Sequence, residues 1–297
     1  MADLVDLTGQ RLDDEQIFAR IDVLPPYYAL TDVALDESNA ITATAPIEQP
    51  LGYEVGPISG AEAGRHLAIC GSIAAAWANP KAGRFHYLAT DAEIRRARGN
   101  LPADVTELRL RATGSMVDKR TAHATVFAST PDGQTICSLS CYYSVVGYDM
   151  MRKMFSDHCV DTPADAPNPY VELIDPEQVD IAGGHIEIDL GPVQPERCVG
   201  HFQDLPAMPV AYLMSNVTAA AGRLLQRQTA DPDLRFSVAE GSVRADGLAF
   251  TGENVVLKGE HQGTRYGMEW LYLEAFADAE KRVGAVHLKV KPEPAAD

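Results

Sequence analysis

The order of apolar segments repeats within the 297-residue chain, and this repeat constrains the fold more than any single motif. In each half, two short extended segments precede a long helix of small and apolar residues, and a run of strand-like segments follows. The helices are expected over residues 59–78 and 209–226. A segment rich in proline and aspartate, 156–169, separates the halves and indicates a linker. We therefore predict one unit at residues 1–155 and a second at 170–297.

Each predicted helix is apolar over most of its circumference, which favours a buried position. A sheet with one apolar face must cover that face, and a single long helix does so when a curved sheet wraps around it. Two such units side by side can pair their edge strands, which removes two exposed edges. We predict an α+β fold, a double hot-dog in which two curved antiparallel sheets each wrap a long central helix and join into one sheet. Hairpin turns are expected at residues 131–133, 246–247 and 262–263.

The charge balance excludes several classes of function. The chain has 25 Lys and Arg against 42 Asp and Glu, a formal net charge of −17. This opposes binding to nucleic acid or to anionic membranes, because both need a positive surface. No segment approaches the roughly 20 apolar residues of a membrane span. The N-terminus lacks the basic start and apolar core of a signal peptide, so a cytoplasmic location is expected.

The cysteines point to neither disulfides nor a metal. There are five, an odd number, and no two form a CxxC pair. We expect free thiols in a reducing compartment and no metal site. The five residues are Cys70, Cys137, Cys141, Cys159 and Cys198.

Three passages resemble a known family. They are IFARIDVLPPYYALTDV at 17–33, AEAGRH at 61–66 and GHFQDLPAMP at 200–209. They are similar to the amino-terminal signature, the central-helix pattern and the active-site loop of the β-hydroxyacyl-acyl carrier protein dehydratases. That family works as a hot-dog dimer in which a histidine of one unit faces an acid on the other unit's helix. The resemblance implies a hydro-lyase that dehydrates 3-hydroxyacyl thioesters on acyl carrier protein or coenzyme A and uses no cofactor.

One catalytic pair can be assembled across the two halves. The resemblance places the base at His201, and Glu62 on the first helix is the acid. Dehydration needs a base for the C2 proton and an acid for the departing hydroxide, and histidine titrates near neutral pH without much tuning. His66 lies one turn after Glu62 on the same helix face, where it could orient the carboxyl group or hold the departing water. We predict all three as catalytic residues.

The substrate contacts are expected at the loop that carries the histidine. The backbone N–H of Val210, at a helix N-terminus, would polarise the thioester carbonyl. The other predicted substrate-binding residues are Gly200, Phe202 and Pro209. Gln203-Asp204 replaces the Pro-Gly that often follows the loop in the family, and Val210 stands where glycine is usual.

The two halves could form a second, equivalent site, but that site lacks both the acid and the base. Tyr53 stands where the first half would carry a histidine, and Ser215 where the second helix would carry an acid. The spacings differ, nine residues from Tyr53 to Glu62 and fourteen from His201 to Ser215. We predict one working site and one silent site.

Several alternatives stay open. Ser59 and Glu62 also form a capping-box pattern, in which the carboxylate would serve the helix N-terminus instead of catalysis. The chain could then be a non-catalytic acyl-binding subunit, or an acyl thioesterase on the same fold with Glu62 activating water. The basic run of Arg95, Arg96 and Arg98 could hold a pantetheine or coenzyme A phosphate, although a solvated turn explains it too. A homodimer of two such chains is also compatible with the sequence.

Overall fold

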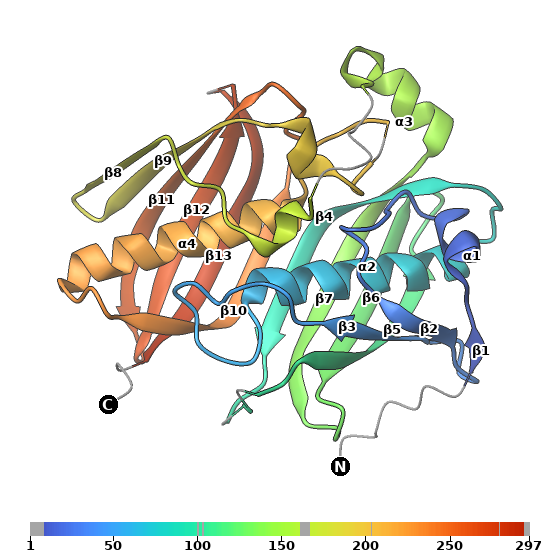
Figure 1. Ribbon diagram of the computed structural model, residues 1–297, viewed down its shortest axis with the longest axis horizontal. Helices are drawn as coiled ribbons and strands as arrows, with labels where there is room; N and C mark the ends of the chain where they lie inside the picture. Colours follow the sequence, from blue (N-terminus) through green and yellow to red (C-terminus); the bar gives the residue numbers. More distant parts are fainter. Residues whose placement is uncertain are drawn as a thin grey trace.

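A single sheet runs through the whole molecule. The computed structural model describes residues 9–99, 101–102, 104–160, 167–202, 204–278 and 280–293. In this part of the chain thirteen strands pair in the order β1-β2-β3-β5-β6-β7-β4-β10-β13-β12-β11-β9-β8, and all the ladders are antiparallel. Figure 1 shows the long helices α2 and α4 lying across this sheet.

The first seven strands of the order belong to the N-terminal half. Helix α2 (Gly60–Ala78) covers them, and the short helix α1 (Asp14–Phe18) follows the first strand in the chain. The strands are β1 (Gln10–Arg11), β2 (Thr31–Leu35), β3 (Ile41–Pro46), β4 (Phe85–Arg96), β5 (Glu107–Met116), β6 (Thr121–Ser129) and β7 (Thr135–Gly147). Helix α3 (Tyr148–Met154) follows β7 directly and is not among the elements that the sequence pattern predicts.

The remaining six strands belong to the C-terminal half. Helix α4 (Val210–Thr229) packs against them. The strands are β8 (Gln178–Ala182), β9 (His185–Pro192), β10 (Arg235–Ala245), β11 (Asn254–Arg265), β12 (Met268–Ala277) and β13 (Lys281–Glu293). Short 3-10 turns lie at Ser156–His158, Pro169–Val171 and Pro195–Cys198. The central part of the predicted linker, residues 161–166, lies outside the described residues.

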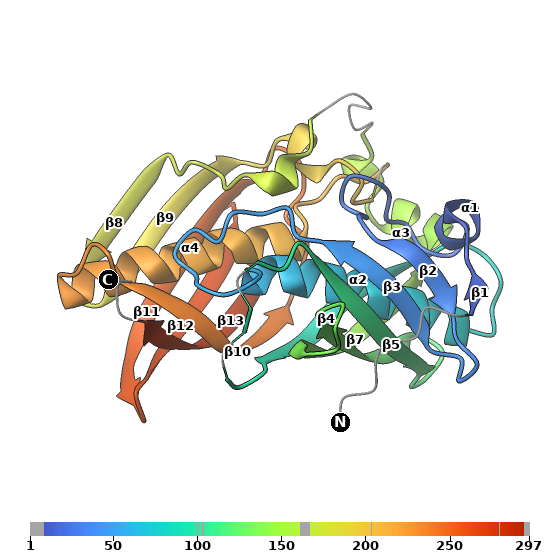
Figure 2. The same ribbon diagram turned by 60° about the horizontal axis from the view of Figure 1, so that its bottom comes forward.

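The two halves join through the pairing of β4 with β10. These strands are antiparallel, with Arg95 opposite Glu240 and Asp91 opposite Arg244. This confirms the expected continuous sheet, in which the two inner edges are paired instead of exposed. Figure 2 shows the strands curving beneath both helices, with α4 following α2 along the same side of the sheet. The helices also contact each other.

Helix α2 packs closely on the sheet because small residues permit it. Ser59 caps its N-terminus and accepts a hydrogen bond from the amide of Glu62. Gly114 of β5 lies directly against the helix, so that a Cβ atom at this position would overlap the backbone of Ala74 and Ala75. The helix is buried on nearly every side, as the sequence predicts for a central helix.

Two of the three predicted hairpin turns need correction. The turn at 131–133 joins β6 to β7 as predicted. The turn at 246–247 does not pair β10 with the next strand, because β10 instead lies between β4 and β13. At 262–263 the chain forms a bulge inside β11, and the actual turn is at Tyr266-Gly267, where both residues have positive φ.

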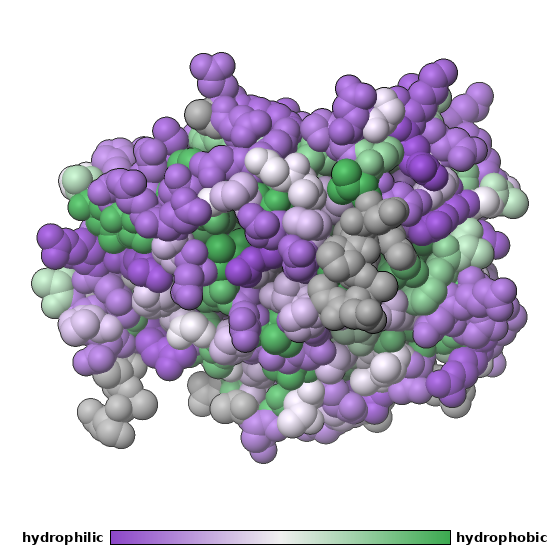
Figure 3. All heavy atoms as spheres, turned by 45° about the horizontal axis from the view of Figure 1, so that its top comes forward, coloured by the Kyte–Doolittle hydropathy of each residue, from purple (hydrophilic) through white to green (hydrophobic). Residues whose placement is uncertain are grey.

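One face of the molecule is mainly hydrophilic. Figure 3 shows one face, on which hydrophilic residues predominate and hydrophobic ones form small groups between them. Within the described residues, no helix is both long and apolar enough to cross a lipid bilayer.

Candidate active site

A large cavity lies between the two helices and the middle of the sheet. Its volume is about 620 Å³, within the range typical of small-molecule sites. Residues of α2, α4 and the central strands β4, β7, β10 and β13 line it, and most of these are apolar or small. Met154 and Lys281, which are both exposed, are among the lining residues, so the cavity reaches the surface.

His201 lies in the wall of this cavity. Its side chain is 8% exposed. Its Nδ1 lies 3.0 Å from the carbonyl oxygen of Ala207. A carbonyl only accepts, so Nδ1 carries the proton and Nε2 holds the lone pair. Burial lowers the pKa of His201 to about 4, although the Ala207 carbonyl acts in the opposite direction. The imidazole is therefore neutral at pH 7 and can accept a proton.

Tyr27 connects His201 to the first turn of α4. Its ring centroid is 4.9 Å from that of His201, and its hydroxyl interacts with the backbone amide of Ala211. Val210, the first residue of α4, lines the same cavity. The amide of a first helical residue has no partner within its helix. The N-terminus of α4 thus offers a hydrogen-bond donor and a positive dipole end beside the histidine.

The loop that carries His201 is held by the N-terminal half. The amide of Leu24 donates to the carbonyl of Gly200 over 2.7 Å, and Val23 forms an isolated bridge with His201. Gly200 has a φ of 80°, and a Cβ there would overlap the carbonyl of Leu24, so only glycine fits. Phe202 lines the cavity with its ring stacked 3.9 Å from that of His201. Pro209 stands at the N-cap of α4.

Glu62 and His66 lie on the other face of α2. The positions of α2 that line the cavity include Gly60, Gly64 and Ala68. Neither Glu62 nor His66 is among the described lining residues, since they project from the opposite side of the helix. The structure therefore brings His201 and Val210 to one cavity and does not bring Glu62 or His66 there.

The carboxylate of Glu62 is engaged with the loop before α2. Its Oε1 accepts from the amides of Glu48 and Gln49 over 2.6 and 3.1 Å and lies 3.7 Å from His66 Nε2. It does not return to the backbone of its own helix N-terminus, so only the Ser59 half of the capping box forms. Burial lowers the pKa of His66, an effect that the Glu62 carboxylate partly offsets.

Tyr53 and Ser215 do meet, around a second and much smaller cavity. Both line a space of about 20 Å³ between the loop at 49–54 and α4. Tyr53 packs so closely on α4 that a side chain at Gly222 would overlap its ring. A space of this size holds about one water molecule.

Two arginines of the basic run have partners within the protein. Arg96 donates to the backbone carbonyls of Val55 and Ile58 and so holds the loop before α2. Arg95 is exposed and pairs with Glu93 on its own strand. The guanidinium of Arg96 is thus occupied by backbone carbonyls, and a phosphate contact by this run stays a prediction.

A buried polar cluster that contacts Phe202 is not visible in the sequence pattern. Asp22 is buried and forms an ion pair with Arg84, and Nδ1 of His86 lies 3.3 Å from its carboxylate. Burial lowers the pKa of His86 to about 3, and its ring packs edge-on against Phe202 at 4.8 Å. Arg84 and His86 follow Asp22 by 62 or more positions in the chain. Because no known motif has this spacing, only the fold shows the contact.

The fold is shared with several solved structures. No protein-family model and no curated protein matches the sequence. Among solved structures, one match is a tesB protein from Mycobacterium avium subsp. paratuberculosis. The superposition covers 85% of this chain and 93% of that protein, with a TM-score of 0.57 and 11% sequence identity. Another match is an acyl-ACP thioesterase from Bacteroides thetaiotaomicron. The superposition covers 86% of this chain and 99% of that protein, with a TM-score of 0.54 and 10% sequence identity.

A third match names the architecture. It is a protein of unknown function with a hot-dog fold from Alicyclobacillus acidocaldarius. The superposition covers 90% of this chain and 97% of that protein. The TM-score is 0.52 and the identity 13%. This chain has a hot-dog fold. The general prediction of that fold is thereby confirmed, while the dehydratase activity stays a prediction.

Within this hot-dog fold, helix α2 presents two chemically distinct faces. One is small and apolar and borders the large cavity, and the other carries the buried charged and polar side chains. The cavity is suited to an apolar chain with a reactive group near His201.

Proposed function

We propose that this chain is an acyl thioesterase built as a double hot-dog, with His201 as the general base. The observation that carries the proposal is the position of His201. A neutral, buried imidazole stands in the wall of an apolar cavity, beside the N-terminus of α4. We further propose residues 1–155 and 170–297 as the two hot-dog units, because strands β1–β7 and β8–β13 form separate blocks of the sheet order.

The proposed reaction needs one base and one donor. The acyl chain lies in the cavity, and the thioester carbonyl accepts a hydrogen bond from the Val210 amide. Water attacks the carbonyl carbon while Nε2 of His201 takes its proton. The positive end of the α4 dipole stabilises the oxyanion. The C–S bond then breaks, the thiolate recovers the proton from His201, and a free carboxylic acid and a thiol remain.

Hydrolysis fits the cavity better than dehydration does. A dehydratase must also protonate a departing hydroxide, and the predicted acids, Glu62 and His66, project from the other face of α2. A thiolate is a far better leaving group and needs no separate acid. Two of the structural matches described above are named as thioesterase or tesB proteins, which favours the same choice. We therefore assign neither Glu62 nor His66 to water activation.

Incubation with paired substrates tests the assignment. The purified chain is given an acyl-CoA and a 3-hydroxyacyl-CoA of equal length, and free thiol and enoyl product are measured separately. Release of free thiol from both supports the proposal. Enoyl product without thiol would instead support the dehydratase predicted from the sequence, and unchanged substrate an acyl-binding subunit. The same acyl groups on acyl carrier protein identify the preferred carrier.

The pH profile gives a further expected result. Because the pKa of His201 is about 4, the base stays neutral throughout the physiological range. We expect the rate of hydrolysis to be nearly constant from about pH 8 to 6 and to fall only as pH approaches the lowered pKa. An inflection near 6.5, the ordinary value for histidine, would contradict the buried position of the ring.

The smaller cavity is expected to be silent. Tyr53→Phe and Ser215→Ala together should leave kcat/KM within a few-fold of the parent, because about 20 Å³ cannot admit a thioester. The measurement is the thiol-release assay on the double variant. A loss as large as that of a His201 variant would show that the second site contributes to catalysis.

A further inference from the structure

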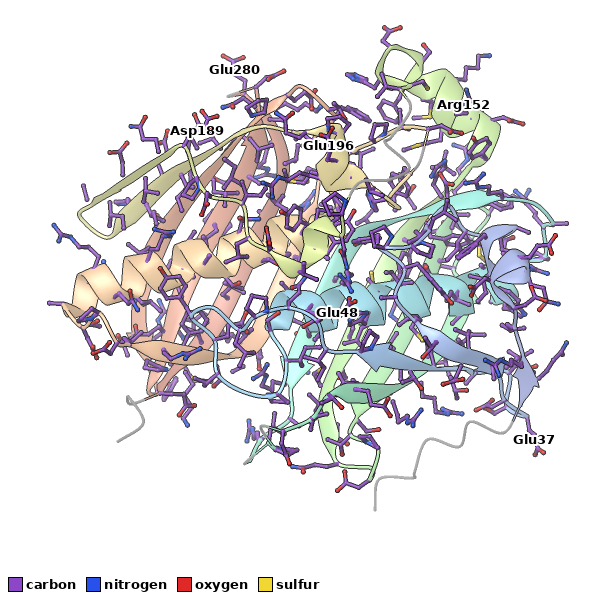
Figure 4. The ribbon with its side chains drawn as sticks, in the orientation of Figure 1. Glu37, Glu48, Arg152, Asp189, Glu196 and Glu280 are labelled. Carbon is purple, nitrogen blue, oxygen red and sulfur yellow. The ribbon has the colours of Figure 1, made fainter. Side chains whose placement is uncertain are left out.

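The far face of α2 carries a buried polar cluster that the proposed thioesterase reaction does not use. Glu62 and His66 lie one turn apart on the helix, and both side chains are 0% exposed. Glu48, on the loop between β3 and α2, lies against them and is 27% exposed. Figure 4 labels Glu48 where this loop crosses α2. We call these three residues the α2 acidic cluster.

The cluster holds several polar atoms that the protein leaves without a partner. Both ring nitrogens of His66 are buried, and neither forms a hydrogen bond within the described residues. The same holds for Oε2 of Glu62, although its Oε1 accepts two backbone amides. Native structures rarely bury such atoms unpaired, so each calls for an unseen partner.

Ligand atoms of the three side chains lie close to one another. One ligand atom from each of Glu48, Glu62 and His66 lies within 4.8 Å of the other two. His66 Nε2 and Glu62 Oε1 are 3.7 Å apart. Two ligands of one tetrahedral zinc ion, each at about 2.1 Å, lie roughly 3.4 Å from each other. A small rotation of the side chains would therefore close the three groups around one ion.

The charges are compatible with a dication. Two carboxylates face the site, and the guanidinium of Arg65 donates to Glu48 Oε2 over 2.5 Å, which leaves one net negative charge. Arg65 packs against the ring of Tyr170 on its other side. It thereby fixes one oxygen of Glu48 and leaves the other free to bind.

We propose that Glu48, Glu62 and His66 form a binding site for a divalent transition metal. One imidazole nitrogen with two carboxylate oxygens is a donor set that suits Zn²⁺ and similar ions, whereas Mg²⁺ and Ca²⁺ prefer oxygen alone. The site lies across α2 from the cavity, so the metal would bind the loop at 48–49 to the helix and would not touch the substrate. Its role is structural.

Metal content measures this directly and does not depend on any activity. The purified chain is incubated with zinc chloride and dialysed, and the zinc per chain is measured by mass spectrometry, with titration calorimetry for affinity. We expect one tightly bound zinc and a rise in the melting temperature. Glu62→Gln, close in shape, and His66→Gln should each weaken binding by about tenfold or more.

His86→Gln is the matched control, because His86 is equally buried beside a carboxylate but lies outside the cluster. It should keep its zinc. Circular dichroism on each variant separates loss of a ligand from loss of the fold. If the parent retains no zinc after dialysis, or if folded His66→Gln and Glu62→Gln retain as much as the parent, the site does not exist.

Discussion

His201→Gln should reduce kcat/KM for acyl thioester hydrolysis by about 10²–10⁴-fold, the usual contribution of a general base. Glutamine keeps a polar side chain of similar reach at the cavity wall but cannot take a proton from water. The thiol-release assay gives the rate, and a thermal melt establishes that the variant is folded. Loss of rate with KM little changed would place the effect in the chemical step.

His185→Gln is the control for this variant. His185 is exposed at the hairpin between β8 and β9 and is not among the residues that line the cavity. Its replacement should leave the rate at the parental value. If His201→Gln is folded and retains nearly full activity, the base must be sought among the other residues that line the cavity.

Gly114→Ala should be among the most destabilising single substitutions in the molecule. A Cβ at this position would overlap the backbone of Ala74 and Ala75, and backbone cannot move aside as a flexible side chain can. Helix α2 would have to shift away from β5. Overpacking of this kind typically costs about 1–3 kcal/mol and occasionally more. The free energy of unfolding from urea denaturation measures the effect.

Gly64→Ala is the matched substitution on the other face of α2. No heavy atom lies within 4 Å of a Cβ at Gly64, which borders the cavity. Alanine is favoured over glycine inside a helix by about 0.5–1 kcal/mol, so this variant should be as stable as the parent or more so. Equal stability of the two variants would mean that α2 is not seated on β5 as described.

The sequence predicts the fold well because the fold rests on local patterns. The long apolar helices and the alternating strands are visible as periodicity, and α2 begins within one residue of the predicted start. The incorrect predictions concern strands whose partners are distant in the sequence. At Asp246-Gly247 no hairpin forms, because β10 pairs with β4 and β13, which the local sequence cannot show.

The sequence predicts the part of the candidate site that comes from one continuous segment, but not the part that depends on how distant segments pack. His201 and Val210 come from one continuous motif, and both line the cavity. Glu62 comes from a different segment, and its placement depends on how α2 is rotated about its axis. Helices α2 and α4 begin at Gly60 and Val210, so the position equivalent to Ser215 is Arg65, not Glu62. Neither Arg65 nor Glu62 is among the described residues that line the cavity, so counting from the helix start does not find the side of α2 that faces it.

The pairing of β4 with β10 has a consequence for how the protein behaves on dilution. The cavity takes His201 from one unit and Tyr27 and the small face of α2 from the other. In an enzyme assembled from separate subunits, such a shared site disappears as the concentration falls below the dissociation constant. Here both contributors belong to one chain, so their encounter is intramolecular and its effective concentration is set by the chain itself. The specific activity should therefore be the same at nanomolar as at micromolar protein.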